Sequence, residues 1–236
     1  MILAREDQTL EEHIERCLES FESIRCKKFW KMFGEKAEKD FRIAIVLHDS
    51  GKIFYQGKKS FLGHEIFSAF ISHVFTREFP DLNSKLVEAI ILYHHYAMGL
   101  KDRIKKFKIE FKDFKVCNKS EEFEEILEEH KSIALKYIDL EGSSVKKAME
   151  KVNESIRKRL NGCRLEYGGT LEILKEENSE IWKRFVSEKD FRKLALFCIN
   201  MMTVVDYAGA LEKGKKTDFG RVVEEFIRIY APLGRL

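Results

Sequence analysis

Apolar residues recur along most of this chain at the three- and four-residue spacing of amphipathic helices. Near the start, for example, Ile14, Cys17 and Phe21 would share one face of a helix. The sequence holds only 2 prolines, so little interrupts long helices. The pattern predicts an all-α fold, with helices at about residues 9–30, 35–49, 63–79, 82–97, 121–140, 143–161, 171–186, 190–212 and 219–231.

Polar residues mark several of the expected helix boundaries. Thr9 followed by Glu12 has the spacing of a capping box, in which each side chain binds the other residue's backbone N–H. Ser50 and Gly51 are expected to end the second helix, and residues 50–62 read as a loop. Pro80 is expected to end the third helix.

The middle of the chain departs from the helical pattern. Between residues 101 and 120, lysines alternate with phenylalanines without a clean helical period. No low-complexity linker or internal repeat divides the sequence. We therefore expect a single domain over residues 1–236, with a core at about 9–97 and 190–212 and a helical or irregular insertion at about 100–189.

Composition narrows the class of protein only slightly. Basic and acidic residues nearly balance, at 43 and 40, so the net charge neither requires nor excludes a nucleic-acid partner. The 5 cysteines are scattered without a C-x-x-C spacing, which fits reduced thiols better than a disulfide framework or a structural zinc site. The sequence lacks both a signal peptide and an apolar stretch of the roughly 20 residues that span a bilayer, so we expect a cytoplasmic protein without a membrane contact.

Histidines and aspartates interrupt the apolar helical segments. They are His13 in the first helix, His48 and Asp49 at the end of the second, His64 at the start of the third, His94 and His95 at the end of the fourth, and Asp206 in the run MMTVVDYAG. An ionised carboxylate in such a run is costly to bury unless a cation compensates it. Imidazoles and carboxylates are usual ligands of divalent metals, and one carboxylate can bridge two ions. Two bridged metals suit phosphodiester hydrolysis, because one activates a water and both stabilise the developing charge.

Each of these residues also has a structural interpretation. A single histidine on a helix, such as His13, is more often a surface or core residue than a ligand. Asp206 could pair with a buried lysine or cap a helix. Neighbouring residues on a helix point about 100° apart, so His94 and His95 can reach one site only near a helix end. Two further histidines have no comparable context and are assigned structural roles: His73 and His130.

The joint order of the candidate residues resembles a known family. The pattern H…HD…D resembles the HD superfamily of metal-dependent phosphohydrolases, and it is carried here by His13, His48, Asp49 and Asp206. HDSGK at 48–52 resembles the HD-x-GK form of that superfamily. GHE at 63–65 and the doublet at 94–95 are similar to the stand-alone HD nuclease of type I CRISPR interference, which degrades DNA beside a helicase. The segment VVDYAGA also resembles that nuclease, although Ala210 stands where the family often has Ser or Thr.

The resemblance implies a helical HD-domain bundle that binds two divalent metal ions in its core. One ion would be bound by His13, His48, Asp49 and Asp206, and the other by His64, His94 and His95, with Asp49 bridging the two. Asp49 and Lys52 would be catalytic, because Lys52 would stabilise the charge of the scissile phosphate. Histidine-rich ligation permits Mn, Fe, Co, Ni or Zn, and Mg is a further candidate. The implied partners are single-stranded DNA, RNA as a second substrate, a separate helicase subunit and the CRISPR surveillance complex.

A basic and aromatic stretch follows the histidine doublet directly. Between residues 101 and 115 the sequence holds seven basic residues interleaved with three phenylalanines. Cations that follow a backbone and rings that stack on bases are what a single-stranded nucleic-acid path requires. An equally good interpretation is a solvated segment whose phenylalanines belong to the core. The candidate nucleic-acid contacts in this stretch are Lys105, Lys106, Phe107 and Lys108, and Lys58 and Lys59, just after HDSGK, are a second candidate.

Three functions are compatible with these residues. The first is a nuclease on single-stranded DNA in CRISPR antiviral defence, cutting as an endonuclease or exonuclease with metal-activated water as nucleophile. The second is an HD phosphohydrolase for nucleotides or cyclic nucleotides, which the generic H…HD…D set would serve equally. The third is a non-catalytic, metal-bound scaffold that recruits a helicase. The added histidines and the basic stretch favour the first, and the presence of every expected ligand counts against the third. The chain has no P-loop, so any helicase is expected to be a separate protein.

Overall fold

The computed structural model describes residues 1–24, 27–58, 60–95, 114–117, 119–166, 168–210 and 221. Over these ranges the fold is all-α with only short strands, as the sequence predicts. The helices are α1 (Leu10–Ile24), α2 (Lys27–Phe33), α3 (Glu35–Leu47), the 3-10 helix η1 (Ser50–Tyr55), α4 (His64–Thr76), α5 (Ser84–Tyr93), α7 (Ser120–Tyr137), α8 (Gly142–Arg157), α9 (Gly168–Ser187) and α10 (Lys189–Gly209). Two antiparallel hairpins complete the set: β1 (Leu3–Arg5) with β2 (Gln8–Thr9), and β3 (Leu160–Asn161) with β4 (Arg164–Leu165).

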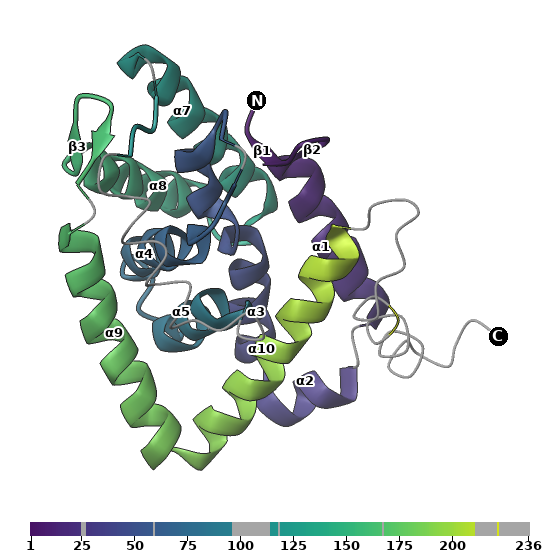
Figure 1. The fold of residues 1–236 in the computed structure, drawn as a ribbon. Coiled ribbons are helices and arrows are strands. Elements are labelled where there is room, and N and C mark those ends of the chain that lie inside the picture. The colour runs from purple at the N-terminus through teal and green to yellow at the C-terminus, as the bar shows by residue number, and fades with distance from the viewer. Residues whose placement is uncertain are drawn as a thin grey trace.

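The centre of the bundle is formed by α3, α4 and α5 (Figure 1). α4 packs against α5, η1, α8 and α9, and α1 lies alongside α10 on one flank. Buried apolar residues from all these helices form one continuous core. In the described ranges, no helix has both the length and the apolar character needed to cross a membrane.

The start of α1 is fixed by the predicted capping box. The backbone N–H of Thr9 donates to Glu12 Oε2 at 2.9 Å, and the N–H of Glu12 donates to Thr9 Oγ1 at 3.1 Å. The backbone hydrogen bond of Thr9 is also the main reason why the pKa of Glu12 lies below its usual range. This reciprocal pair sets where the first turns of α1, including His13, begin.

Two of the expected element boundaries are wrong. The single helix expected at 9–30 is two helices, because Trp30 folds back until its ring lies 5.7 Å from that of Phe21. On one straight helix, residues nine positions apart would be separated by about 13 Å. The expected loop at 50–62 begins with η1, whose six residues are all buried. The helix expected at 219–231 lies outside the described residues, apart from position 221.

The cysteines differ from the expectation of reduced thiols. Cys117 and Cys163 form a disulfide with a Cα–Cα distance of 5.3 Å, across 46 residues of sequence. The β3–β4 hairpin brings them together, since the N–H of Val116 donates to the carbonyl of Cys163 at 2.9 Å. Cys17 and Cys198 are free and buried, and Cys26 lies outside the described residues. Sequence spacing could not reveal the pair because the hairpin that aligns it is only two residues long on each side.

Asp40 on α3 yields a prediction about stability. Its buried carboxylate accepts a hydrogen bond from the N–H of Asn83 at 3.2 Å, and burial raises its pKa to about 6. A raised folded-state pKa means that stability is greatest below the unfolded value and falls as the pH rises through about 6. We therefore expect Asp40→Asn, which keeps an acceptor oxygen, to stabilise the protein by roughly 1–2 kcal/mol near pH 8.

Thermal unfolding across a pH series tests this prediction. The melting temperature of Asp40→Asn should exceed that of the wild type near pH 8, and the difference should disappear toward pH 4. Asp139→Asn, a change at an exposed aspartate, should show no such pH-dependent gain. If Asp40→Asn is destabilised by the same amount at every pH, the prediction is wrong, because the carboxyl group would then stabilise the fold whatever its charge.

Candidate metal centre

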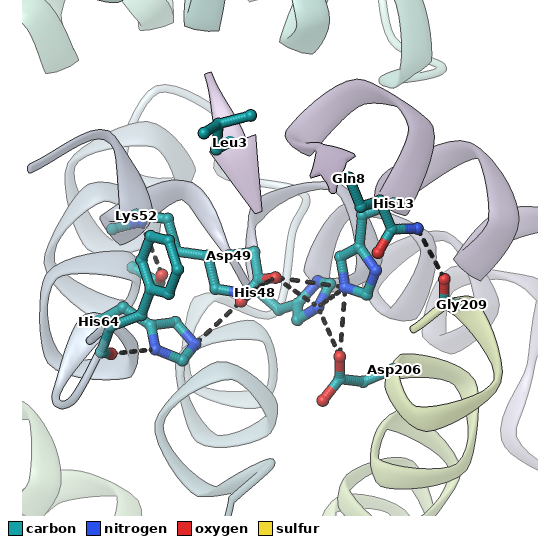
Figure 2. A network of polar contacts seen from close by, with 12 residues as sticks. Leu3, Gln8, His13, His48, Asp49, Lys52, His64, Asp206 and Gly209 are labelled. Carbon is teal, nitrogen blue, oxygen red and sulfur yellow. Dashed lines mark hydrogen bonds and ion pairs between the residues drawn. The ribbon is translucent and has the colours of Figure 1, made fainter. Parts of the chain in front are cut away.

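Helix ends from five parts of the chain converge on one site. Figure 2 shows His13, His48, Asp49, His64 and Asp206 among the side chains that meet there. α3 ends at Leu47, directly before His48 and Asp49. α4 begins with His64, and α5 ends just before His94 and His95. α1 contributes His13 from its first turn, and α10 contributes Asp206 from its last turn. The doublet at 94–95 thus lies just beyond a helix end, where neighbouring side chains can share a site.

The first group of side chains surrounds the imidazole of His13. Its Nε2 lies 3.2 Å from Asp49 Oδ2, 3.2 Å from Asp206 Oδ1 and 3.3 Å from His48 Nε2. His48 Nε2 lies 3.6 Å from the same two carboxylate oxygens. These four residues are buried, and their potential ligand atoms all lie within 4.8 Å of one another, so they could hold a metal ion.

The second group contains three histidines. His64, His94 and His95 also present ligand atoms within 4.8 Å of one another. Asp49 joins the two groups, because its Oδ2 faces His13 while its Oδ1 lies 2.9 Å from His64 Nε2. The two oxygens of one carboxylate are therefore directed at two separate clusters, as a bridging ligand requires.

Backbone carbonyls orient three of the imidazoles in the same way. The Nδ1 atoms of His48, His64 and His94 each donate to the carbonyl three residues earlier, at 2.7, 2.7 and 2.6 Å. A carbonyl can only accept, so Nδ1 carries a proton, and in the neutral ring Nε2 keeps its lone pair. Nε2 of His94 is buried and has no hydrogen-bond partner within the described structure. A buried nitrogen lone pair that receives no hydrogen bond is expected of a histidine that ligates a metal ion. The histidine nitrogens and aspartate oxygens of this site fit a divalent cation.

Charge is distributed unevenly over the site. Burial alone would raise the pKa of Asp49, but Lys52 and nearby histidines hold it well below its usual range. Burial would lower the pKa of His13, but Cys17 and the two aspartates raise it well above its usual value. A proton on His13 thus compensates the buried carboxylates, and a cation bound there would release that proton.

The histidine doublet has the opposite electrostatics. Burial, together with nearby histidines, lowers the pKa of His94 to about 4. Burial and the adjacent imidazole also lower the pKa of His95. Both rings are therefore neutral at physiological pH, which is the form that binds metals.

Lys52 follows Asp49 on η1 and is almost fully buried. Its ammonium lies 2.5 Å from Asp49 Oδ2 and 5.4 Å from the centre of the Phe61 ring. The sequence singles out this lysine from the motif HDSGK, and the structure brings it to the edge of the histidine and aspartate clusters. It is positioned to neutralise negative charge beside Asp49.

Glycine allows α10 to approach α1 closely enough for this geometry. A Cβ on Gly209 would overlap the Sγ of Cys17 and would lie 3.3 Å from the carbonyl oxygen of His13. Cys17 Sγ is itself 3.7 Å from His13 Nε2. The small residue near the end of α10 therefore lets Asp206 lie beside His13.

One histidine assigned a structural role touches the site indirectly. His130 on α7 is buried, and its Nε2 lies 2.9 Å from the hydroxyl of Ser50, the residue after Asp49. Burial lowers its pKa to about 4, so the ring is neutral. The sequence pattern did not indicate this contact, because His130 is an isolated histidine in an acidic segment. Only the packing of α7 on η1 brings it next to the site.

His73, the other histidine assigned a structural role, belongs to a separate buried group. Its Nδ1 lies 3.2 Å from Glu88 Oε1 and 3.7 Å from Glu177 Oε1. Lys85 forms ion pairs with both glutamates. Lys85 thus compensates part of the negative charge of this group, and the network ties α4, α5 and α9 together.

A pocket of about 310 Å³ opens onto the candidate ligands. Its lining includes side chains from the clusters as well as residues that the sequence did not indicate, and comprises Ala4, Arg5, Lys52, Ser60, Phe61, Leu62, His64, His95 and Asp206. A larger hollow of about 460 Å³ lies between α3 and the end of α7 and contains none of the candidate ligands. The smaller pocket is therefore the one associated with the chemistry.

The candidate nucleic-acid contacts are only partly described. Lys58 is exposed, and its ammonium lies 5.2 Å from the centre of the Phe114 ring. Phe114 packs against the core and lies 5.3 Å from the Tyr55 ring, which agrees with the core interpretation for this phenylalanine. The others lie outside the described residues: Lys59, Lys105, Lys106, Phe107 and Lys108.

Comparison with known proteins gives one match. The family model described as HD domain matches residues 10–187. No curated protein and no solved structure matches the chain. The matched range includes six of the seven candidate ligands and ends before Asp206, which the structure nevertheless brings to within 3.2 Å of His13.

Proposed function

The chain belongs to the HD-domain family of metal-dependent phosphohydrolases, and from this premise we propose that it is a nuclease that hydrolyses the phosphodiester bonds of single-stranded DNA. The observation that carries the proposal is the position of Asp49 between two histidine-containing clusters. A single-metal hydrolase needs only one such cluster, whereas phosphodiester cleavage benefits from ions on both sides of the phosphate.

In this proposal the seven side chains form two adjoining metal sites. His13, His48 and Asp206 would hold one ion, the three remaining histidines would hold the other, and Asp49 would bridge them. When bound, such ions supply an activated water and stabilise charge on the phosphate. Mn, Fe, Co or Ni suits the histidine-rich ligands best, Zn suits them also, and Mg is the least suited of the candidates.

The protein's own groups contribute orientation and charge. The carbonyls that bind Nδ1 hold three imidazoles with Nε2 directed into the site, so little reorganisation accompanies ligation. The ammonium of Lys52 would leave Asp49 and bind the substrate phosphate once cations neutralise the carboxylate. Burial of the ligands excludes water, which strengthens each of these electrostatic contacts.

Single-stranded DNA is the proposed substrate for two reasons. The seven basic residues at 101–115 follow the histidine doublet directly in sequence, and cations interleaved with aromatic residues are what a single-stranded nucleic-acid path requires. Lys58 adds an exposed cation just after η1, on the segment that leads to Phe61 and the pocket. By sequence resemblance, the proposed setting is CRISPR antiviral defence beside a separate helicase and the surveillance complex, with RNA as a second substrate.

A second candidate function is the hydrolysis of nucleotides or cyclic nucleotides. The pocket volume of about 310 Å³ favours it, because this is the size of a small-molecule site. The generic set of His13, His48, Asp49 and Asp206 would serve either reaction. The second cluster of three histidines and the basic segment, which a free nucleotide does not need, favour the nuclease.

One experiment decides between them. Metal-stripped protein is mixed with end-labelled single-stranded or duplex DNA, and Mn, Ni, Co or Mg is added singly. In parallel, phosphate release is measured from nucleotides and ring opening from cyclic nucleotides. Metal-dependent cleavage restricted to single strands supports the nuclease. No DNA cleavage with any metal, alongside nucleotide hydrolysis, would replace it with the small-molecule function.

Lys52→Ala is expected to lower kcat by roughly 100-fold without loss of metal, because it removes a phosphate-binding charge rather than a ligand. The measurement is steady-state cleavage together with metal content by mass spectrometry. Lys158→Ala, at an exposed lysine paired with Glu154, is the matched control and should behave as wild type. An unchanged kcat in Lys52→Ala would limit this lysine to pairing with Asp49.

A further inference from the structure

Arg5 lies in the pocket of the candidate centre, although nothing in the sequence pattern singles it out. It ends strand β1, a three-residue element too short to produce a periodic signal. The pocket that it lines also contains Lys52, His64 and Asp206. A cationic residue thus lines the same pocket as the clustered metal-ligating side chains.

The hairpin that carries Arg5 is fastened to the site from both sides. Gln56 accepts the N–H of Leu3 at 2.8 Å and donates to the carbonyl of Lys52 at 2.7 Å, which ties β1 to η1. Gln8 on β2 donates to the carbonyl of Gly209 at 2.9 Å, which ties the hairpin to the end of α10 (Figure 2). These are the only glutamines in the chain. One fastens the hairpin to η1, which follows Asp49, and the other fastens it to the end of α10, which carries Asp206.

Arg5 has no counter-charge within the described structure. Its side chain forms no hydrogen bond or ion pair with a described residue, and its buried Nε atom lacks any partner there. Lys52, the other cation of the pocket, is by contrast paired with Asp49. Leaving a partly buried guanidinium unpaired is unfavourable, so its position requires an explanation other than the stability of the fold.

The chemistry of the group identifies its partner. A guanidinium stays charged at all physiological pH values and presents a planar fork of donors that matches two oxygens of a phosphate. The aromatic ring of Phe61 lines the same pocket and offers a surface on which a base could stack. An anionic phosphate with an attached base is therefore the ligand that this pocket suits.

We propose that Arg5 is a substrate-binding residue whose guanidinium holds the non-bridging oxygens of a substrate phosphate at the mouth of the metal centre. This inference rests on the proposed function only in that the substrate is a phosphate ester, since a DNA strand and a free nucleotide both present these oxygens. Arg5 binds and orients this phosphate, while the metal-ligating residues carry the chemistry.

The test compares Arg5→Gln and Arg5→Lys with Arg77→Gln, which removes the same charge from an exposed position at the far end of α4. KM and kcat are measured on whichever phosphate ester the wild type hydrolyses, and the affinity of the Mn-loaded proteins for inorganic phosphate is measured by calorimetry. We expect Arg5→Gln to raise KM and to weaken phosphate binding about 10- to 100-fold, the effect of losing a charge-assisted hydrogen bond. Arg5→Lys should recover part of this loss, and Arg77→Gln should show none.

Melting temperature and metal content separate binding from folding. The metal content should be unchanged and the melting temperature should not fall in Arg5→Gln, because the side chain has no partner in the described structure. A fall in either, or a KM and phosphate affinity equal to those of Arg77→Gln, would overturn the inference. If the wild type hydrolyses no phosphate ester, the proposed function fails, and the phosphate affinities of the two variants still decide the role of Arg5.

Discussion

Asp49→Ala is expected to abolish hydrolysis, by a factor of roughly 1,000 or more, because it removes the one side chain shared by both clusters. Its Oδ2 lies 3.2 Å from His13 Nε2, and its Oδ1 lies 2.9 Å from His64 Nε2. No neighbouring side chain is placed to replace both contacts among the described residues. Loss of the carboxylate should therefore reduce the metal content as well as the rate.

The experiment must separate chemistry from folding. Asp49 also neutralises Lys52, so its removal leaves a buried cation unpaired in the metal-free protein. Circular dichroism and thermal unfolding of Asp49→Ala, with and without Mn, report on the fold, and mass spectrometry reports on bound metal. Asp139→Ala, at an exposed aspartate, is the control. A folded Asp49→Ala protein that still hydrolyses the substrate at a rate near that of wild type would refute the bridging role.

Gly51→Ala is expected to disrupt the site through the backbone alone. A Cβ at this position would overlap the carbonyl oxygen of His64 and would lie 2.8 Å from the backbone nitrogen of Ser68. Both are backbone atoms of α4, so neither can rotate away. The N–H of Gly51 also donates to Ser68 Oγ at 2.8 Å, and this hydrogen bond would break if the added Cβ pushed η1 away from α4. We expect a loss of about 3 kcal/mol or more in the free energy of unfolding.

The same displacement should weaken metal binding. Asp49 lies two residues before Gly51, and His64 begins the helix that would be pushed away, so their 2.9 Å contact would lengthen. Chemical denaturation measures the stability, and metal titration measures the affinity. Gly142→Ala is a suitable control, because a Cβ there would meet no atom within 4 Å. If Gly51→Ala is as stable as this control, the close approach of η1 to α4 is not required.

Much of the fold and of the site could be predicted from sequence, since both depend on local patterns. Helical periodicity predicts most of the described helices, and the Thr9–Glu12 spacing predicts the start of α1. Histidines and aspartates at the ends of apolar helices predict a cluster, because buried polar groups require partners. The structure brings the seven predicted side chains together, and the roles we give them are proposals.

The features that sequence did not predict depend on contacts between distant residues. The Cys117–Cys163 disulfide depends on a hairpin with two residues in each strand. Arg5 reaches the pocket only because two glutamines fasten β1 and β2 to η1 and α10. The break between α1 and α2 reflects the packing of Trp30 onto Phe21. Elements so short, and pairs so far apart in sequence, leave no periodic signal.

The most direct test of the central claim, a two-metal centre that hydrolyses phosphodiesters, is a titration of activity against bound metal. Metal-stripped protein receives Mn in steps, and cleavage of single-stranded DNA is plotted against the ions bound per chain, as measured by mass spectrometry. We predict little cleavage with one ion per chain and full activity as the second ion binds. Asp49→Ala should show no cleavage at any amount of added Mn. Full activity with a single ion per chain, or cleavage by the stripped protein, would contradict a two-metal centre bridged by Asp49.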